Sequence, residues 1–590
     1  MTSRVGAGGY GGSLGRRSRT WDTLAPRELP VTTARQASEL DALSIAAGIP
    51  SRALMQRAGA AAAAETLHIL HRCATTDVLV YAGSGNNGGD GWVVARSLAA
   101  AGVPVSVVAV GDTRTDDARA ERALAEADPS VRVLPFEEYA GAVGMGASGM
   151  GAPAVVVDAL LGTGAKGAPR DPVARAIALI AQARERGATI VSLDIPSGVD
   201  ADSGAAESAV HADFTLTFGT IKRGLLVARG ATGRIVLLDI GLRHGGEGHA
   251  PRDAPPDARR AARRDAVLVT ERWVHSIIPP FTADAHKGTR KKLVIVGGQM
   301  GMAGAPVLAA RAAMRTGIGM VRLVVAPESL PAVQSSEPHA LARAWPDDRA
   351  GWDEAIGSWA DVVLIGPGLG ASDRSRAMVE HVLRSWIGPV VLDADALNVF
   401  AGEPESLGKL LDGRCALITP HAVEFSRLSG AAVADVLERR FDAGAELAQR
   451  VGAVVLLKGV PTVVAAADGA RLVSAAGTPA LAAAGSGDLL GGIAATLLAQ
   501  LGDARHAGAA AAWVHGRAAE IAEAVAERGG TGRGWERAFG REPRSGRRAA
   551  GTARGVTLVD IEEAIARVWR EDVPSPSYPV LAELPAVGDV

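Results

Sequence analysis

Residues 77–101 read DVLVYAGSGNNGGDGWVVARSLAAA. The run Asp77–Tyr81 has the apolar, β-branched character of a buried strand, and Trp92–Ala101 has the character of a helix. The segment between them, Ala82–Gly91, contains five glycines, which allow tight turns and a close approach to a ligand. A glycine-rich turn between a buried strand and a helix is typical of phosphate and dinucleotide binding, because free N–H groups at the helix N-terminus face the ligand.

Further strand-length apolar runs follow, most of them separated by helix-length segments rich in Ala, Arg and Glu. In the first half of the chain they are Val103–Val110, Ala154–Asp158, Thr189–Asp194, Phe214–Phe218 and Arg234–Leu238. In the second half they are Lys292–Gly297, Met320–Ala326, Asp361–Gly366, Pro389–Asp393, Cys415–Thr419, Val454–Lys458 and Thr462–Ala466. Buried strands that alternate with helices form a parallel sheet covered by helices on both faces. We therefore predict an α/β protein with two three-layer α/β/α domains.

The length of the chain and breaks in this alternation set the predicted domains. At 590 residues the chain is too long for a single hydrophobic core. Residues 245–265 mix Gly, Pro, Asp and Arg without an apolar period, which predicts a linker. The full prediction is a disordered extension at 1–29, a first domain at 30–244, the linker at 245–265, a second domain at 266–572 with a disordered insertion at 528–554, and a tail at 573–590.

The composition limits the classes of function. The formal net charge is −2, which argues against broad electrostatic attraction to nucleic acid or to an anionic membrane. No run is apolar enough for a transmembrane helix, and residues 1–29 lack the apolar core of a signal peptide. The two cysteines, Cys73 and Cys415, are expected in different domains, so we expect no disulfide framework and a cytoplasmic location. We also expect a homo-oligomer, whose size the sequence does not set.

Two carboxylates in the first half follow predicted strands. Asp158 precedes LLGTG at 160–164, and Asp194 precedes IPSGVD at 195–200. The carboxyl ends of parallel strands form the ligand crevice of an open sheet, so both should lie near the loop that carries Asn87. A single strand-end aspartate is more often a cap for the turn that follows it. Two of them beside a glycine-rich loop favour a ligand site.

The second half repeats this arrangement with different sequences. Predicted strands are followed by GGQMGMAGA at 297–305, GPGLG at 366–370, DADAL at 393–397 and TPH at 419–421. The most specific feature is GSGD at 485–488, followed by the predicted helix Leu489–Leu501. Its backbone N–H groups suit developing phosphate charge, and Asp488 beside them can take a proton from an attacking hydroxyl. For His421, a ligand contact and a purely structural role both remain open.

The motifs GNNGGDG at 85–91 and DIPSGVD at 194–200 together resemble the NAD(P)H-hydrate epimerase family, over about Thr32–Gly241. The resemblance implies a Rossmann-like domain that interconverts the R and S hydrates at C6 of the reduced nicotinamide ring, with Asp194 as the acid–base residue. It also implies a potassium ion held by the hard oxygen atoms of Asn87, Asp158 and Ser197. The residues that would bind the hydrated dinucleotide are Asn86, Asn87, Gly88, Gly89, Asp90, Gly162, Thr163, Gly164, Ala165, Lys166, Gly167, Ala168 and Asp194.

The HKG segment at 286–288 and the second-half loops together resemble ADP-dependent NAD(P)H-hydrate dehydratase, which has a ribokinase-like fold, over about Val267–Arg570. The resemblance implies that ADP phosphorylates the C6 hydroxyl of the S hydrate with Asp488 as the base, that magnesium bridges the nucleotide phosphates, and that phosphate is then eliminated. The products would be NADH or NADPH, AMP and phosphate. The hydrate would be contacted by Ala305, Gly370, His421 and Asp488, and the nucleotide by Lys458, Gly459, Val460, Pro461, Thr462 and Gly487.

Two segments depart from the usual pattern of the dehydratases. After Thr-Pro-His these usually carry Pro-Gly-Glu, where this chain has Ala422, Val423 and Glu424. Before the anion-binding turn they usually read Gly-Asn-Pro-Gly-Met-Ala-Thr-Gly, where this chain reads GTPALAAA at 477–484. Lost glycines restrict the backbone and add Cβ atoms near the site. The departures therefore predict weaker nucleotide binding or altered specificity, with the activity retained.

Two other functions remain open at this point. A small-molecule kinase of the ribokinase-like fold, of the hydroxymethylpyrimidine kinase type, would explain Gly487 and Asp488 but gives the first domain no purpose. A non-catalytic dinucleotide-sensing module would bind nucleotide without turnover, and the presence of Asp194 and Asp488 argues against it. Under the resemblance, the linker predicts that the two activities can be separated by cutting the chain there.

Overall fold

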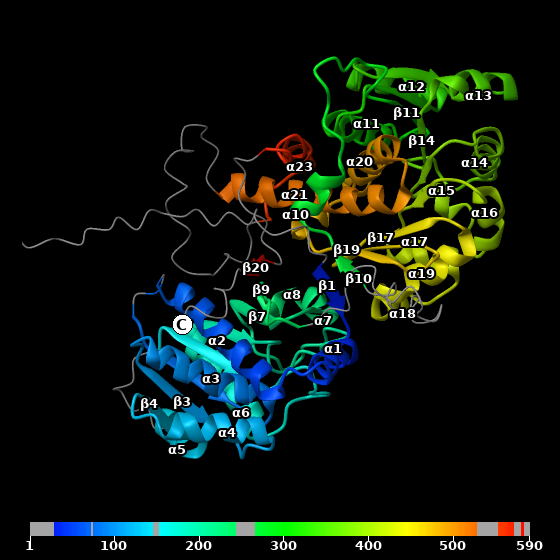
Figure 1. Ribbon diagram of the computed structural model, residues 1–590. Coiled ribbons are helices and arrows are strands. Elements are labelled where there is room, and N and C mark those ends of the chain that lie inside the picture. Colours follow the sequence, from blue (N-terminus) through cyan, green and yellow to red (C-terminus); the bar gives the residue numbers. More distant parts are fainter. Residues whose placement is uncertain are drawn as a thin grey trace, which may run out of the picture.

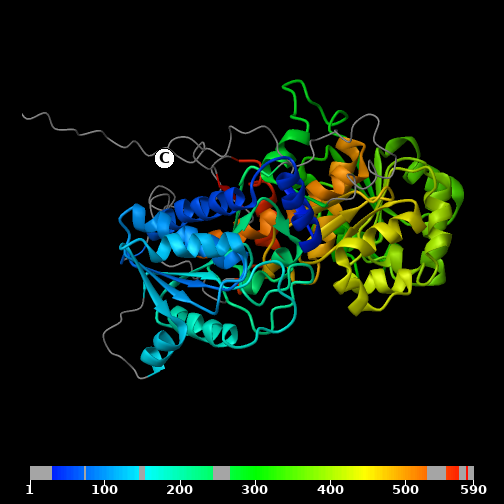
Figure 2. The same cartoon turned by 60° about the horizontal axis from the view of Figure 1, so that its bottom comes forward.

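The computed structural model describes residues 29–71, 73, 75–144, 153–242, 266–527, 553–570 and 580–582. Their strands form two sheets, each with helices packed against it (Figures 1 and 2). The predicted linker lies outside the described residues, as does most of the predicted extension, insertion and tail. Three pieces of those segments are described and differ from the prediction: Leu29 and residues 580–582 lie in strands, and residues 553–554 lie in a turn.

The first sheet has eight strands in the order β20-β9-β7-β6-β5-β2-β3-β4, and all their pairings are parallel. The strands are β2 (Val78–Ala82), β3 (Val105–Ala109), β4 (Val131–Pro135), β5 (Val155–Ala159), β6 (Thr189–Leu193), β7 (Phe214–Phe218), β9 (Arg234–Leu238) and β20 (Val580–Ala582). The helices of this half are α1 (Ala34–Ala46), α2 (Ser51–Leu70), α3 (Asn86–Ala100), α4 (Asp116–Glu126), α5 (Phe136–Gly144), α6 (Val173–Glu185), α7 (Arg223–Val227) and α8 (Arg229–Thr232).

Successive residues of β2 are buried on opposite faces of this sheet. Val78 and Val80 belong to the core that contains residues of α2 and α3, whereas Leu79 and Tyr81 belong to the core that contains residues of α6. All five residues of the strand are buried, which requires a helical layer on each face. The predicted α/β class with parallel strands is confirmed for this half.

Helix α3 begins earlier than the sequence predicts. The predicted loop Ala82–Gly91 ends at Gly85, and Asn86 is already the first helical residue. The glycines that suggested a loop instead allow the helix to pack closely on the strand end, since a Cβ atom on Gly88 would lie 1.9 Å from the carbonyl oxygen of Gly83. The free N–H groups of the helix N-terminus are thereby placed at the carboxyl edge of the sheet.

The second sheet has twelve strands in the order β13-β12-β11-β14-β15-β16-β17-β18-β19-β10-β1-β8. The strands are β1 (Leu29–Thr32), β8 (Ile221–Lys222), β10 (Ala266–Leu268), β11 (Lys292–Val296), β12 (Met320–Val325), β13 (Leu341–Ala344), β14 (Val362–Ile365), β15 (Val390–Leu392), β16 (Ala416–Ile418), β17 (Val454–Leu457), β18 (Thr462–Ala465) and β19 (Arg471–Ser474). Pairing is parallel from β13 to β17 and antiparallel from β17 through β19.

Helices cover both faces of the second sheet as well. They are α10 (Glu271–Ile277), α11 (Gly304–Thr316), α12 (Leu330–Ser336), α13 (Arg349–Ala355), α14 (Asp373–Ser385), α15 (Asp395–Asn398), α16 (Pro404–Leu411), α17 (Ala422–Ser429), α18 (Val433–Glu438), α19 (Arg440–Val451), α20 (Ser486–Leu501), α21 (Ala504–Glu527) and α23 (Leu558–Ile565), with short 3-10 turns η1 (Pro327–Ser329), η2 (Gly357–Trp359) and η3 (Pro479–Leu481). Leu293 of β11 lies in the core with residues of α11 and α20, and its neighbour Val294 lies in the core with residues of α14 and α19. The predicted three layers are present in this half too.

Strands of the first half complete the second sheet. Strand β10 pairs with β19 on one side and with β1 on the other, and β1 also pairs with β8 (Figure 1). Val31 lies opposite both Ala266 and Ile221 in these pairings. Val31 and Ile221 are fully buried in a core that also contains Phe441 and Val473 of the second half. The predicted boundaries therefore separate segments that share one hydrophobic core.

Polar contacts reinforce this shared core. The Arg223 guanidinium lies 3.1 Å from a carboxylate oxygen of Asp442 and 5.0 Å from the ring centroid of Phe441. Asp442 is also bonded to Arg471, at 2.7 Å. A fragment that begins at the linker lacks β1, β8 and Arg223 and exposes this core to water. We therefore no longer expect that cutting the chain at the linker gives two independent units.

We expect Phe441→Ala to destabilise the whole protein, because the ring is buried where the two halves meet. The free energy of unfolding should fall by about 3–5 kcal/mol, the usual cost of removing a buried aromatic ring. Leu43→Ala, at an exposed leucine of α1, is the control and should change it by less than about 0.5 kcal/mol. Guanidinium unfolding followed by tryptophan fluorescence measures both. Equal midpoints for the two variants would contradict the shared core.

Candidate active sites

The first candidate site lies at the carboxyl ends of β2, β5 and β6. The parallel register places Asp158 of β5 opposite Tyr81 and Ser192 of the neighbouring strands. Asn87, in the first turn of α3, donates hydrogen bonds to the carbonyl oxygens of Leu161 (2.8 Å) and Leu193 (3.2 Å), which follow or end these strands. The expected convergence of the strand-end residues near Asn87 is thus observed.

Asp158 and Ser197 form a buried network beside Asn87. Ser197 donates from Oγ to Asp158 Oδ1 (2.6 Å) and from its backbone N–H to Oδ2 (2.9 Å), and Ser192 Oγ donates to Oδ2 (2.8 Å). Burial raises the pKa of Asp158, although these hydrogen bonds oppose the shift. The side-chain oxygen of Asn87 is also buried and has no hydrogen-bond donor among the described residues. Three hard oxygen donors, one of them unpartnered, are of the class that binds an alkali-metal cation.

Asp194 contacts a residue that the sequence did not single out. Lys222 Nζ forms an ion pair with Asp194 Oδ1 and donates to Thr217 Oγ1 (3.2 Å) and to the carbonyl oxygen of Phe218 (3.0 Å). The lysine side chain is 3% exposed. Asp194 has φ 61°, a left-handed conformation that non-glycine residues rarely adopt and that often marks functional sites. The signal in the sequence was that Lys222 is one of only seven lysines in the chain.

Asp90, half-buried on α3, belongs to the same charged group. Burial and the negative charge of Asp194 raise the pKa of Asp90 well above its usual value. The predicted hydrate-binding residues of the first half form two sets around these carboxylates. One set is the start of α3, where Asn86 is exposed and Gly88 and Gly89 pack against Gly83 and Met55. The other set, Gly162–Ala168, is a half-exposed to exposed loop that begins beside Asn87.

The second candidate site lies at the carboxyl ends of β15, β16 and β17. Lys458 Nζ lies 2.9 Å from Asp393 Oδ1 and 3.4 Å from Glu424 Oε2. Burial alone would lower the pKa of Lys458, but the charges of Asp393 and Glu424 outweigh it and raise the pKa. A Cβ atom on Gly487 would lie 3.5 Å from Lys458 Nζ, so the lysine faces the predicted anion-binding turn. A phosphate bound at this turn would therefore lie near the lysine ammonium.

Asp488 lies in the first turn of α20, which begins at Ser486 rather than at the predicted Leu489. Burial and the negative charge of Asp393 raise the pKa of Asp488 to about 7, and the charge of Lys458 opposes this shift. A carboxyl group with such a pKa can both take and give a proton near neutral pH. Gly485 caps the helix with φ 94°, a left-handed conformation that favours glycine.

His421 has a structural role in the described structure. Its Nδ1 accepts hydrogen bonds from the backbone N–H groups of Val423 (3.1 Å) and Glu424 (3.3 Å), and so caps α17. Its side chain is nevertheless 48% exposed, so its ring remains accessible beside the Lys458 cluster. His421 can therefore cap α17 and contact a ligand at the same time.

The glycine loops of the second half form the rest of this site. Gly370 donates its N–H to Asp395 Oδ2 (2.8 Å). A Cβ atom added to Gly370 would lie 2.2 Å from Gln299 Oε1. A Cβ atom added to Gly368 would lie 3.2 Å from the Cβ atom of Ala305. Gln299 was not predicted as a site residue. In the predicted nucleotide segment, Thr462 Oγ1 donates to the carbonyl oxygen of Gly459 (3.0 Å), and Val460 is exposed. The same segment contains Pro461, next to the half-exposed Thr462.

The departures from the dehydratase pattern cause no backbone strain. The non-glycine residues with positive φ in the described part of the chain are Asp194, Lys291 and Ala394. The residues that replace glycine, Val423, Ala480 and Ala484, are not among them, so none of the three occupies a conformation that requires glycine. Thr478 caps η3 by accepting a hydrogen bond from the N–H of Ala480 (3.2 Å). The predicted penalty for the lost glycines is therefore not seen in the backbone, although their effect on nucleotide affinity stays a prediction.

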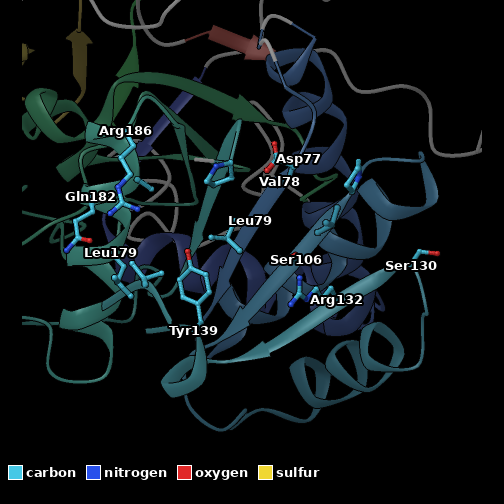
Figure 3. A pocket seen from close by; sticks show the side chains of 15 residues that line it. Asp77, Val78, Leu79, Ser106, Ser130, Arg132, Tyr139, Leu179, Gln182 and Arg186 are labelled. Carbon is cyan, nitrogen blue, oxygen red and sulfur yellow. The ribbon is translucent and has the colours of Figure 1, made fainter. Parts of the chain in front are cut away.

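A pocket of about 340 Å³ lies in the first half of the chain (Figure 3). It lies at the amino ends of β2 and β3, between α5 and α6, where Leu79, Tyr139, Arg132 and Arg186 line it. None of the predicted site residues lines it. In open parallel sheets ligands bind at the carboxyl ends of the strands, so this pocket is not the reaction crevice.

Comparison with known proteins gives the family. Residues 293–532 match the family described as NAD(P)H-hydrate dehydratase, and residues 51–224 match the one described as YjeF-related protein N-terminus. A bifunctional NAD(P)H-hydrate repair enzyme of Coxiella burnetii is 36% identical over 504 residues, covering 84% of this chain and 95% of that protein. The chain belongs to the bifunctional NAD(P)H-hydrate repair enzymes. This confirms the family that the motifs at 85–91 and 485–488 indicated.

Two other members of this family have similar sequence identity to this chain. The enzyme of Salinibacter ruber is 37% identical (83% of this chain, 92% of that protein), and the enzyme of Escherichia coli K12 is 36% identical (75% and 80%). Among solved structures, an ADP/ATP-dependent NAD(P)H-hydrate dehydratase from Bacillus subtilis, co-crystallised with ATP and Mg²⁺, is 28% identical, covers 51% of this chain and 97% of its own, and has a TM-score of 0.42. In the described part of this chain, no helix is long and apolar enough to cross a membrane.

We expect the carboxyl group of Asp488 to titrate near pH 7. Asp393→Asn should lower the pKa of Asp488, because it removes the negative charge that raises it, and Lys458→Met should raise the pKa further, because it removes the opposing positive charge. Carbon NMR of protein labelled at aspartate Cγ, assigned with Asp488→Asn, measures these values. A titration near pH 4 in the unmodified protein, or shifts of opposite sign in the variants, would contradict the assigned environment.

Proposed function

We propose that the first half epimerises the R and S hydrates of NADH and NADPH and that the second half dehydrates the S hydrate at the expense of ADP. The observation that carries this proposal is the presence of two separate strand-end clusters, each with a buried lysine–aspartate pair, in a chain of the repair-enzyme family. In the first cluster the lysine pairs directly with Asp194, the candidate acid–base residue, whereas in the second the lysine faces the turn Gly485–Asp488. Proton transfer alone suits the first, and phosphoryl transfer suits the second.

In the first site, epimerisation requires the C6–oxygen bond to open and close. The nitrogen of the nicotinamide ring supplies the electron pair as the hydroxyl leaves with a proton, and water or hydroxide then adds to the other face. The Asp194–Lys222 pair can hold and return that proton, since the two groups share a contact and lie at the crevice. Asn86–Asp90 and Gly162–Ala168 border the same crevice and would hold the dinucleotide.

A potassium ion would be held by Asn87, Asp158 and Ser197. Their oxygen atoms fit the ion's preference, and the unpartnered, buried oxygen of Asn87 is the observation that supports this site. The ion would supply positive charge near the dinucleotide. These three residues also tie the start of α3 to the loop after β6, so they position Asp194 through the backbone.

In the second site, Asp488 would take the proton of the C6 hydroxyl, whose oxygen attacks the terminal phosphorus of ADP. The bond between that phosphorus and the bridging oxygen breaks and releases AMP. The phosphate then leaves C6, a proton leaves C5, and the double bond of the reduced nicotinamide is restored. Lys458 and the N–H groups of residues 485–487 would face the phosphates, and magnesium, which would arrive with the nucleotide, would offset their negative charge.

We expect that purified protein given mixed hydrates, ADP and Mg²⁺ restores the absorbance of the reduced nicotinamide completely. The companion products should be AMP and free phosphate. Accumulation of a phosphorylated small molecule would instead favour the kinase alternative. The same assay with ATP in place of ADP tests the expected preference for ADP.

Asp194→Asn and Asp488→Asn should separate the two reactions. Each change keeps the shape of the side chain but removes the carboxylate, so the affected reaction should slow by at least roughly 100-fold. Asp194→Asn should abolish recovery from the R hydrate and leave turnover of pure S hydrate unchanged. Asp488→Asn should slow turnover of pure S hydrate, while R-to-S epimerisation, followed directly on the hydrates, and ADP binding, measured by calorimetry, are kept. Loss of both reactions in one variant would contradict the assignment of one site to each reaction.

Epimerisation should depend on potassium. Replacing K⁺ by Na⁺ or choline should slow it, and Asn87→Ala should weaken the response to K⁺ by roughly 10-fold or more, since the unpartnered oxygen is lost. Turnover of pure S hydrate in the same buffers is the control. An epimerisation rate that is the same with K⁺, Na⁺ and choline would contradict the proposed potassium site.

We further propose a cytoplasmic location and a homo-oligomeric state. Support for the first is that Cys73 and Cys415 are both free thiols and lie in different halves. The second stays a prediction that sedimentation of the full chain tests.

A further inference from the structure

One segment of the first half reaches the nucleotide site of the second. Arg229, in α8, donates from one guanidinium nitrogen to the carbonyl oxygen of Gly477 (3.1 Å) and from another to that of Ala475. Both acceptors belong to residues 475–485, the strap that connects β19 to the N-terminus of α20. The strap carries no residue that the proposed reaction uses before Gly485, yet it sets where the anion-binding turn begins.

The Gly477 peptide is held from both halves of the protein. Arg229 holds its carbonyl oxygen, and Glu520 Oε1 on α21 accepts its N–H (3.1 Å). Glu520 is fixed in turn by Arg517 at 3.1 Å, and these two side chains are only 3% and 2% exposed. A hydrogen bond from a buried N–H to a carboxylate is among the stronger ones in proteins, so this end of the strap is firmly anchored.

The other end of the strap is bonded to the turn itself. Ser486 Oγ, in the first turn of α20, donates to the carbonyl oxygen of Leu481 (2.7 Å). Leu481 ends η3, which Thr478 caps from within the strap. A single short 3-10 turn therefore connects Gly477 to Ser486, which lies next to Gly487 and Asp488.

The part of the first half that carries Arg229 is itself well anchored. The carbonyl oxygen of Thr232 accepts from Thr215 Oγ1 of β7 (2.7 Å), and that of Ala231 accepts from the N–H of Ala212 (2.8 Å). Arg229 is thus carried by a segment that is hydrogen-bonded to β7 and to Ala212, which precedes that strand. A guanidinium suits two carbonyl oxygens of one segment because its N–H groups diverge in a fixed plane.

We propose that Arg229 is a positioning residue for the nucleotide site: it fixes the strap 475–485, and through it the turn Gly485–Asp488, from the other half of the chain. The proposal rests on the proposed ADP-dependent reaction only for its kinetic consequence. Its structural consequence, the order of the strap and of the turn, requires neither ADP nor the hydrate.

The test uses Arg229→Met, which keeps an extended side chain and removes the donors, and Arg229→Lys, which retains a shorter cation. Arg223→Met is the matched control, because it removes a guanidinium contact between the halves, to Asp442, that does not touch the strap. Hydrogen exchange of the full chain should accelerate at residues 475–488 by roughly 10-fold in Arg229→Met. It should accelerate less in Arg229→Lys and remain unchanged in Arg223→Met.

The kinetic readout separates positioning from general damage. In Arg229→Met the KM for ADP in S-hydrate turnover should rise by roughly 10-fold, with a smaller change in kcat, and R-to-S epimerisation should be unchanged. Unchanged exchange at residues 475–488 would overturn the proposal, as would faster exchange at the strap alone with a normal turn. Equal effects in Arg223→Met would also overturn it. If Arg229→Met does not fold, Arg229→Lys decides by the same criteria. Absence of hydrate turnover in the unmodified protein would instead count against the proposed function, and the exchange result would still stand.

Discussion

Both sites depend on an ion pair between a buried lysine and an aspartate at the end of a strand. Lys222 contacts Asp194 in the first half, and Lys458 lies 2.9 Å from Asp393 in the second. Removing one partner of such a pair leaves an uncompensated buried charge and costs about 3–5 kcal/mol. Each pair therefore fixes the loop that follows its strand. The left-handed backbone of Asp194, which costs about 1–3 kcal/mol, persists because its surroundings hold it.

The same pairing has a different chemical consequence in each half. In the first half Asp194, the candidate acid–base residue, is itself the group in contact with the lysine. In the second half Asp393 forms the ion pair with Lys458, and the negative charge of Asp393 helps to raise the pKa of Asp488 to about 7. The third carboxylate, Glu424, lies 3.4 Å from Lys458 and is held by the cap of α17. The second site thus has a carboxyl group of near-neutral pKa close to a lysine that faces the turn Gly485–Asp488.

The strand-end rule explains which site residues the sequence could predict. Asp158, Asp194 and Asp488 follow recognisable strand or helix signals, and parallel strands bring such positions to one edge. Lys222 follows no such signal. Lys222 is positioned by β8, a strand of only two residues that pairs with β1. Beside this pairing, Thr32 and Thr220, which are 188 positions apart in the sequence, share a hydrogen bond of 2.8 Å. A strand of that length carries no periodicity, so only the tertiary structure reveals it.

The strands that cross the predicted domain boundary have a related physical reason. An edge strand leaves backbone N–H and C=O groups unpaired, and proteins cover such edges. Here the edge of the second sheet is covered by β1 and β8 from the first half, and β9 of the first sheet is covered by β20 from the end of the chain. Residues 222–232 consequently contact three parts of the protein. Lys222 lies in the first site, Arg223 contacts the shared core, and Arg229 is hydrogen-bonded to the strap. A change in one of these contacts therefore acts on a segment that also carries the other two. Any coupling of binding free energy between the two sites through this segment is reciprocal, because thermodynamic linkage requires it.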